Sequence, residues 1–445
     1  MLETPQKIPE PLLDDSDRSR RRWPLILFVA LSVAIILGGG AVMWLLDLGD
    51  RSQREVEVLT ERIREAGEPL TAEEMDAWYT GYAPVQAAPA LEKLIAQWRD
   101  LADEKGAALD IWHALSESYP YSPIPLEDLE ELRAALEPFE SILAALPDAA
   151  AHEYAGFPLD FEDGMEIALP NLAPMRGFMR LLAMQAELAA ARGAFDEADR
   201  HLALGLRMSR FAEETPTIIG GLVGAAVRGV GSHALERILS RYTLPPVAFP
   251  LVRQELATVD PAANFRRAII GERATTYITM IGLYHDPANP MIASNIAPML
   301  REYTRIVDAA RLDVPIEDWD LGPPPNLTIV AVLPDILLPA MRRTLMAFRR
   351  DAAGIRSVQI ALAVEAYRLD RGVLPDTLDA LLDGYLEAIP TDPFDGEPMR
   401  YRVLEDGYVI YSVYIDGVDH GGEKAESHRE DSVGDWPFRV RRAGQ

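Results

Sequence analysis

Apolar residues recur at helical spacing along most of the chain between about residues 55 and 350. Val56, Leu59 and Ile63 fall at i, i+3 and i+7, which places them on one face of a helix. Further helices are expected over 91–101, 126–143, 218–239, 248–258, 261–284 and 295–312. This pattern predicts a large, irregular helical domain over 47–325 in a mainly α protein.

The clearest unit in this region is an antiparallel helical hairpin over 175–212. Gly193-Ala194 separates a helix over 175–192 from a second one over 195–212, and ARGAFDEADRHLALGL resembles the junction and second helix of a tetratricopeptide repeat. A repeat array needs several stacked copies to bury a continuous core. No second copy follows over 209–242, so we expect one hairpin rather than a peptide-binding array.

An uncharged apolar run near the N-terminus, WPLILFVALSVAIILGGGAVMWLL over 23–46, predicts a single transmembrane helix. As a helix it measures about 36 Å, which exceeds a hydrocarbon core of about 30 Å. Trp23 and Trp44 lie near its two ends, where indole rings favour the membrane interface. A cleaved signal peptide is disfavoured, because Asp47 and Asp50 stand where small residues should mark the cleavage site.

The charges that flank this run predict its orientation. Arg18, Arg20, Arg21 and Arg22 precede it, whereas acidic residues follow it. By the positive-inside rule, residues 1–22 form a cytoplasmic leader and the body lies outside the cytoplasm. We therefore expect a signal-anchored protein of the bacterial inner membrane whose main body is periplasmic.

Composition narrows the classes of function. The chain has 445 residues, 43 of them basic and 70 acidic, for a net charge of −27. Such an acidic chain is not expected to bind nucleic acid, because phosphate contacts need a basic surface. The absence of cysteine excludes disulfides, thiolate nucleophiles and cysteine-ligated metals.

No catalytic motif stands out. The seven histidines form no metal-binding pair at i, i+4, and no P-loop, dinucleotide fingerprint or nucleophile elbow is present. Gly271-Glu272-Arg273, inside an apolar helix, is expected to form structural ion pairs, with a catalytic glutamate as the less favoured interpretation. A deep cleft that holds Glu272 or His233 beside a second titratable group would favour an exported hydrolase.

The pattern changes over 326–445, where a helix is followed by a small α+β domain. A helix over 351–371 ends at Gly372. Apolar and basic residues then alternate over 399–404, and Asp406-Gly407 is a turn signal, so 399–404 and 408–414 should form an antiparallel hairpin.

The segments AYRLDRGVLPDTLDALL, YLEAIPTDPFDGEPMRY, GYVIYSVYIDGVDHGG and DSVGDW, in this order, resemble the globular domain of the type II secretion major pseudopilin over about residues 350–438. The matching positions are Tyr367, Asp370, Gly372, Pro375, Pro390, Asp392, Pro393, Gly396, Pro398, Tyr401, Tyr411, Ser412, Asp416, Gly417, Gly421, Gly422, Asp431 and Trp436. This chain differs in having no glutamate within 23–46, no prepilin-type cleavage motif and about 300 residues between anchor and head. The resemblance therefore implies a pseudopilin-like fold rather than a filament subunit.

The same resemblance implies a calcium site in the loop after the Tyr-Ser strand. Asp416 matches the family's acidic ligand, Asp431 matches a downstream one, and Asp419 is added because of its position in the loop. Calcium favours six to eight oxygen ligands on a flexible loop. A solvated acidic loop without metal is the alternative, and the sequence leaves both open.

These observations favour a non-catalytic, membrane-anchored envelope protein that binds another protein and is linked to a type II secretion-like apparatus. The alternatives are an exported hydrolase with its active site in the helical domain, and a structural scaffold of helical hairpins.

Overall fold

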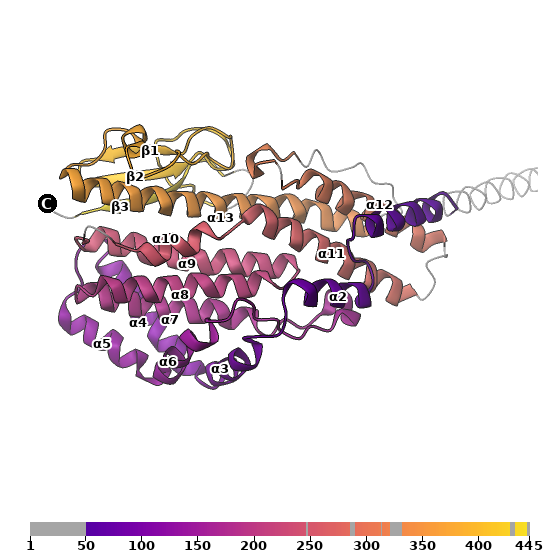
Figure 1. Cartoon of the computed structure of the whole chain (residues 1–445), viewed down its shortest axis with the longest axis horizontal. Coiled ribbons are helices and arrows are strands. Elements are labelled where there is room, and N and C mark those ends of the chain that lie inside the picture. Colours follow the sequence, from indigo (N-terminus) through magenta and orange to yellow (C-terminus); the bar gives the residue numbers. More distant parts are fainter. Residues whose placement is uncertain are drawn as a thin grey trace, which may run out of the picture.

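The computed structural model describes residues 50–245, 248–284, 290–312, 314–320, 332–427 and 432–442. The expected leader over 1–22, the expected anchor over 23–46 and the expected ligand Asp431 lie outside these residues. The described chain is mainly helical, with one small antiparallel sheet near its C-terminus (Figure 1). This arrangement confirms the mainly α fold and the small C-terminal sheet expected from the sequence.

A helix over 50–65 opens the described chain. The labelled helices are α2 (Ala72–Tyr82), α3 (Ala88–Asp100), α4 (Ala102–Ser118), α5 (Leu126–Leu136), α6 (Glu140–Ala149), α7 (Leu172–Ala191), α8 (Phe195–Glu213), α9 (Ile218–Arg241), α10 (Pro250–Ala257), α11 (Pro261–Tyr284), α12 (Pro290–Ala309) and α13 (Val332–Arg371). Short 3-10 helices are η1 (Glu137–Phe139), η2 (Phe161–Glu166), η3 (Ile316–Asp318) and η4 (Leu378–Leu382). The strands are β1 (Arg400–Leu404), β2 (Gly407–Ser412) and β3 (Trp436–Arg441).

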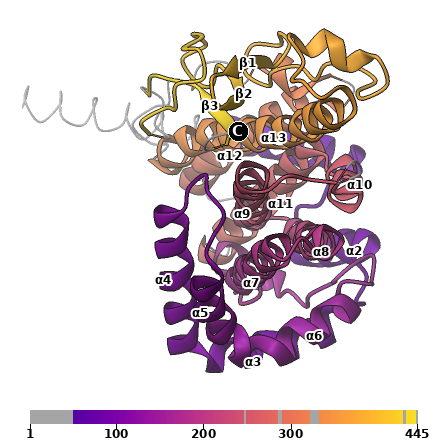
Figure 2. The same ribbon diagram turned by 90° about the vertical axis from the view of Figure 1, so that its left-hand side faces the viewer.

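The elements are stacked in layers (Figures 1 and 2). Helices α3 to α6 cover one side of the α7–α8 pair, and α9 lies against the other side. The long helix α13 follows α9 and carries the sheet on its far face, where it contacts β2 and β3. The helix over 50–65 lies toward one end of the long axis, and the sheet lies toward the other (Figure 1).

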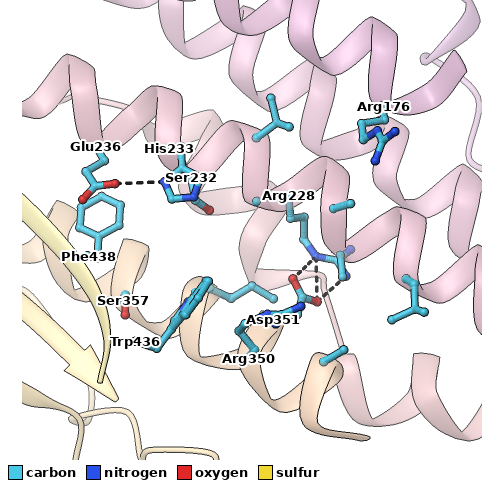
Figure 3. Close-up of a pocket in the computed structure, with 18 of the residues that line it drawn as sticks. Arg176, Arg228, Ser232, His233, Glu236, Arg350, Asp351, Ser357, Trp436 and Phe438 are labelled. Carbon is cyan, nitrogen blue, oxygen red and sulfur yellow. Dashed lines mark hydrogen bonds and ion pairs between the residues drawn. The ribbon is translucent and has the colours of Figure 1, made fainter. Parts of the chain in front are cut away.

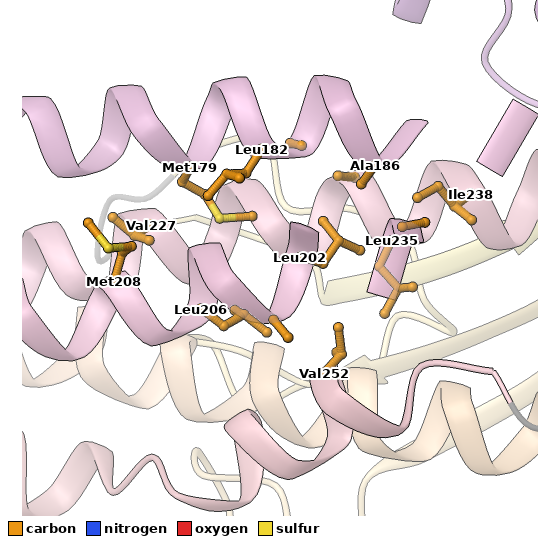
Figure 4. Close-up of a cluster of buried hydrophobic side chains, with 14 of the residues drawn as sticks. Met179, Leu182, Ala186, Leu202, Leu206, Met208, Val227, Leu235, Ile238 and Val252 are labelled. Carbon is orange, nitrogen blue, oxygen red and sulfur yellow. The ribbon is translucent and has the colours of Figure 1, made fainter. Parts of the chain in front are cut away.

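Helices α7 and α8 form the hairpin expected over 175–212. Gly193 lies in the turn between them with φ 76°, a conformation that favours glycine because it has no Cβ. Figure 4 shows Met179 and Leu182 of α7 facing Leu206 of α8 in the buried core. A Cβ on Gly205 would lie 2.0 Å from the Met179 sulfur, so α8 approaches α7 closely because this position has no side chain.

Helix α9 occupies the centre of this core. Among the described residues, it is the one helix whose length and hydropathy would suffice to cross a membrane. It contacts α7, α8, α11, α13 and β3, and Arg228 at its middle is 1% exposed and paired with carboxylates. These neighbours are those of a core helix.

The sheet has the order β1-β2-β3 with antiparallel pairing throughout. The expected hairpin is present, with Leu404 opposite Gly407 at the turn. Strand β3 was not predicted, and it adds to the free edge of β2 after a loop of about twenty residues. Every residue of β2 is buried, because β1 and β3 flank it and α13 covers one face.

Helix α13 joins the helical body to the C-terminal sheet. Its first half contributes Met341, Leu345 and Phe348 to a core cluster with α11, α12 and the helix over 50–65. Its second half lies in another cluster that combines α7, α8 and α9 with the inner face of the sheet, including Tyr408 and Phe438. The regions expected as 47–325 and 326–445 therefore share their hydrophobic core.

Candidate functional site

A cavity of about 670 Å³ lies where α7, α9, α13 and β3 meet (Figure 3). These elements are far apart in the sequence and come together only in the folded chain. The lining residues extend from Arg176 to Phe438. Cavities of this size accommodate organic ligands or peptide side chains. The cavity is therefore the candidate ligand-binding site.

Arg228 of α9 forms one wall of the cavity and is held by a buried ion-pair network. It donates to Asp351 of α13, with Nε 3.0 Å from Oδ1 and Nη2 2.5 Å from Oδ2. It also donates to Glu213 of α8 at 2.5 Å and to Ser209 at 3.1 Å. Burial alone would lower the pKa of this guanidinium, but Asp351 and Glu213 outweigh burial and raise it. This arginine is fully engaged, so its role is structural.

Arg176 and Arg180 of α7 line another wall without such partners. They stand four residues apart and so share one helix face. Within the described part of the chain neither forms an ion pair or a hydrogen bond. Burial, together with repulsion from Arg176, lowers the pKa of Arg180. This pair is a source of uncompensated positive charge.

Arg350 of α13 supplies a third guanidinium from the side nearest the sheet. It lies over the Trp436 ring at 5.3 Å and donates to the Tyr414 hydroxyl at 3.4 Å. No carboxylate within the described ranges pairs with it. Figure 3 shows Arg176 and the Arg350–Trp436 pair on different walls of the same cavity.

His233, which the sequence associated with a possible hydrolase, also lines the cavity. Its Nδ1 lies 3.2 Å from Oε2 of Glu236, one turn along α9. The other oxygen of Glu236 accepts a hydrogen bond from the Arg439 backbone N–H of β3 at 2.8 Å. No serine or threonine hydroxyl of the described chain hydrogen-bonds the imidazole, which is 57% exposed. The arrangement that was expected to favour a hydrolase, His233 beside a second titratable group, is therefore present in the cavity, but within the described residues no hydroxyl nucleophile bonds to the imidazole.

Glu272 of α11 lies outside the cavity. It accepts a hydrogen bond from the Ile218 backbone N–H at 3.2 Å and so caps the first turn of α9, while burial raises its pKa. Its neighbour Arg273, 0% exposed, pairs with Glu68 at 2.7 Å. The expected structural ion pair therefore forms at Arg273, and Glu272 is not among the cavity residues.

The acidic loop expected to hold calcium connects β2 to β3. Asp416 accepts hydrogen bonds from the Val418 and Gly434 backbone N–H groups, and its Oδ2 lies 2.9 Å from Nε2 of His420. Asp419 accepts from the Tyr411 hydroxyl at 3.0 Å and from the Gly421 N–H at 2.8 Å. Both carboxylates thus hold the loop in shape. Within the residues that can be described, no group of three or more acidic or histidine side chains is arranged around a metal position.

Asp435 is the loop carboxylate that the sequence analysis did not single out. It is 0% exposed, and it accepts from the Gly422 N–H at 2.7 Å and the His420 N–H at 3.1 Å. Burial raises the pKa of Asp435, and the negative charge of Asp419 raises it further. The donor set of Asp416, Asp419 and Asp435 is the hard oxygen type that calcium requires. The residue types therefore suit calcium, but among the described residues these carboxylates are not gathered around one position, and each already accepts a hydrogen bond from a backbone N–H group.

Asp392, in the Thr-Asp-Pro block, has a structural role. It accepts from the Ser412 hydroxyl at 2.7 Å, the Val413 N–H at 2.8 Å and Nη1 of Arg400 at 2.9 Å. These contacts connect the turn before β1 to the end of β2. The spacing of this block in the sequence therefore reflects the construction of the sheet.

Comparison with known proteins gives no relative for this chain: no family model, no curated protein and no solved structure matches it.

Proposed function

We propose that this protein is anchored in the bacterial inner membrane by residues 23–46, with residues 1–22 in the cytoplasm and the folded body in the periplasm, and that it acts by binding another protein. The cavity between α7, α9, α13 and β3 is the observation that carries the binding role. It combines three guanidinium groups that lack carboxylate partners in the described chain with an aromatic wall. Unpaired charge beside apolar surface favours recognition of a ligand over a purely structural role.

The C-terminal part is proposed to be a pseudopilin-like module linked to a type II secretion-like apparatus. Two observations support this proposal: the ordered match of sequence segments over about 350–438, and a long helix that packs on an antiparallel sheet. A role as a polymerising subunit is not proposed. Strand β3 contacts α9, and the Arg439 N–H bonds to Glu236, so this face of the module is already covered by the helical body.

Calcium is proposed to bind the β2–β3 loop through Asp416 and Asp419, with Asp431 or Asp435 as a further carboxylate. When bound, the ion would supply charge compensation for the loop. The protein's own contribution is to hold the carboxylates by backbone N–H groups around Gly421 and Gly422.

An exported hydrolase remains the second candidate, because His233 lies beside Glu236 in a real cavity. When the Glu236 carboxylate accepts a hydrogen bond from Nδ1–H, Nε2 is left unprotonated and can act as a base, which is the arrangement used in general-base catalysis. The binding role is favoured because the described structure places no nucleophile against the imidazole.

A photocrosslinking experiment in cells separates the two functions. A photoreactive amino acid replaces Ala225, which lines the cavity, and in a control it replaces Ala134, an exposed residue of α5. The binding role predicts a discrete protein adduct at Ala225 that is absent at Ala134. The purified full-length chain is also tested on ester, peptide and glycoside substrates. Turnover that disappears in His233→Gln, together with no adduct at Ala225, would establish the hydrolase instead.

A further inference from the structure

The charge of the cavity is opposite to that of the chain. The whole protein carries −27, yet the cavity lining contains four arginines and two carboxylates. Both carboxylates are engaged: Asp351 pairs with Arg228, and Glu236 accepts from His233 and from the Arg439 N–H. The positive charge of Arg176, Arg180 and Arg350 is therefore not neutralised by the lining itself.

The positive surface continues past the cavity along α7. A second pocket of about 360 Å³ on the neighbouring side of α7 shares Arg176 and Arg180 and adds Arg99 and Lys105. Lys105 lies over the Trp98 ring at 4.7 Å, so this pocket repeats the combination of cation and indole seen at Arg350 and Trp436. The two pockets form a basic strip with an aromatic ring at each end.

The size and lining of the strip indicate an organic, elongated ligand. A cavity of about 670 Å³ is much larger than a single inorganic anion needs, and its apolar residues include Trp436, Phe438 and Ile355. A ligand that spans both pockets would pass Arg176 and Arg180 at its centre. Guanidinium groups favour carboxylates because their planar donors match the two oxygens.

The position of the cavity argues against a lipid headgroup as the ligand. The cavity is bordered by β3, near the sheet end of the molecule, whereas the helix over 50–65, the described segment nearest to the proposed anchor, lies toward the other end of the long axis (Figure 1). A headgroup of the anchoring membrane would therefore meet the other end first.

We propose that this basic strip binds an acidic peptide segment of a protein partner. Carboxylates of the segment pair with Arg176, Arg180 and Arg350, and an apolar side chain lies against Trp436. This proposal rests on the proposed binding function and specifies the chemistry of the partner. Because both strip and ligand are charged, binding should weaken as salt is added.

The test uses the full-length protein in neutral detergent and a fluorescein-labelled peptide, Asp-Glu-Phe-Glu-Asp, followed by fluorescence anisotropy. The matched neutral peptide is Asn-Gln-Phe-Gln-Asn. The double variant R176Q/R180Q removes the two positive charges at the centre of the strip, where Arg176 is exposed and Arg180 is half-buried. The variant Arg350→Gln removes the third positive charge. The matched control, Arg133→Gln, changes an exposed arginine on α5 that is distant in sequence and does not line either pocket.

The acidic peptide should bind the wild type and the R133Q variant with equal affinity. Its affinity for R176Q/R180Q should be lower by about tenfold or more. Equal binding of the acidic and neutral peptides, or unchanged affinity in R176Q/R180Q at unchanged melting temperature, would overturn the proposal. So would binding of phosphatidylglycerol vesicles, or of inorganic phosphate alone, through the same arginines without binding of the peptide. A protein adduct at Ala225 combined with failure of the peptide would leave the binding function standing and reject only the acidic partner.

Discussion

Arg228 of α9 and Asp351 of α13 form a bidentate ion pair in the interior, with side chains 1% and 5% exposed. The pair connects the helical body to the helix that carries the C-terminal sheet. Glu213 of α8 accepts a further hydrogen bond from the same guanidinium, so three helices meet at one charge. The geometry of the cavity depends on this junction, because Arg228 and Asp351 both line it.

Removal of Arg228 should strongly destabilise the fold. Arg228→Ala leaves Glu213 and Asp351 buried without their cation, a change that costs about 3–5 kcal/mol when one partner of a buried ion pair is lost. Urea unfolding followed by circular dichroism measures this loss. Arg133→Ala, which removes an exposed i, i+3 pair with Glu130, should change the stability far less, because solvent screens exposed ion pairs. A loss of similar small size for Arg228→Ala would show that the buried junction does not hold the helices together.

The crossing of α11 with the loop before α9 depends on Gly271. A Cβ at this position would lie 1.8 Å from the Pro216 carbonyl oxygen, so Gly271→Ala must push the two segments apart. We expect a destabilisation of about 1–3 kcal/mol. Gly282 lies on the same helix with nothing within 4 Å of its added Cβ, and Gly282→Ala should instead be neutral or stabilising by up to about 1 kcal/mol. Thermal unfolding of the two variants side by side checks the contrast, which should vanish if the close approach does not exist.

Glu214 should make the stability depend on pH. Burial raises its pKa from 4.5 to about 7, although N–H groups of Gly156 and Ala155 bond to the carboxylate and oppose this shift. Between these two values the folded state keeps a proton that the unfolded state has lost, so stability falls as pH rises. The wild type should lose up to about 3 kcal/mol relative to Glu214→Gln over that interval. Urea unfolding of both proteins at the two ends of the interval tests this; a difference that stays constant with pH would contradict it.

Calcium should stabilise the full-length protein through the β2–β3 loop. Addition of calcium after removal by a chelator should raise the melting temperature of the wild type, and Asp416→Ala should abolish the rise. The whole chain is required because β3 shares its core with α9. Asp406→Ala, in the exposed turn between β1 and β2, is the control and should keep the rise. An unchanged melting temperature of the wild type would show that the β2–β3 loop does not bind calcium.

Much of the helical pattern was predictable because apolar spacing alone sets it. The helices expected over 195–212 and 261–284 end within one residue of α8 and α11, and the capping box of Thr71 and Glu74, whose signature is local, is present at the start of α2. Strand β3 was missed even though Phe438 and Val440 alternate with arginines. Its pairing with β2 spans a long acidic loop, so no short hairpin turn marks it in the sequence.

The cavity could not be predicted for a related reason. Arg176, Arg228, Arg350 and Trp436 are separated by dozens of residues, and no spacing rule brings them together. In the sequence Arg228 is a single charged residue within the apolar helix expected over 218–239, and no spacing there indicates a partner. Its partners Glu213 and Asp351 come from different helices, so its role follows from tertiary packing.

The location of the folded body outside the cytoplasm is the premise of the proposed function, and it can be measured directly. The chain contains no cysteine, so single cysteines report their own surroundings. The variant Ser16→Cys places a cysteine in the proposed leader. The variant Ser118→Cys places one at an exposed position at the end of α4. With a membrane-impermeant maleimide on intact spheroplasts, S118C should be labelled at once and S16C only after lysis. Labelling of S16C before lysis, or protection of S118C until lysis, would contradict the proposed anchor and its orientation.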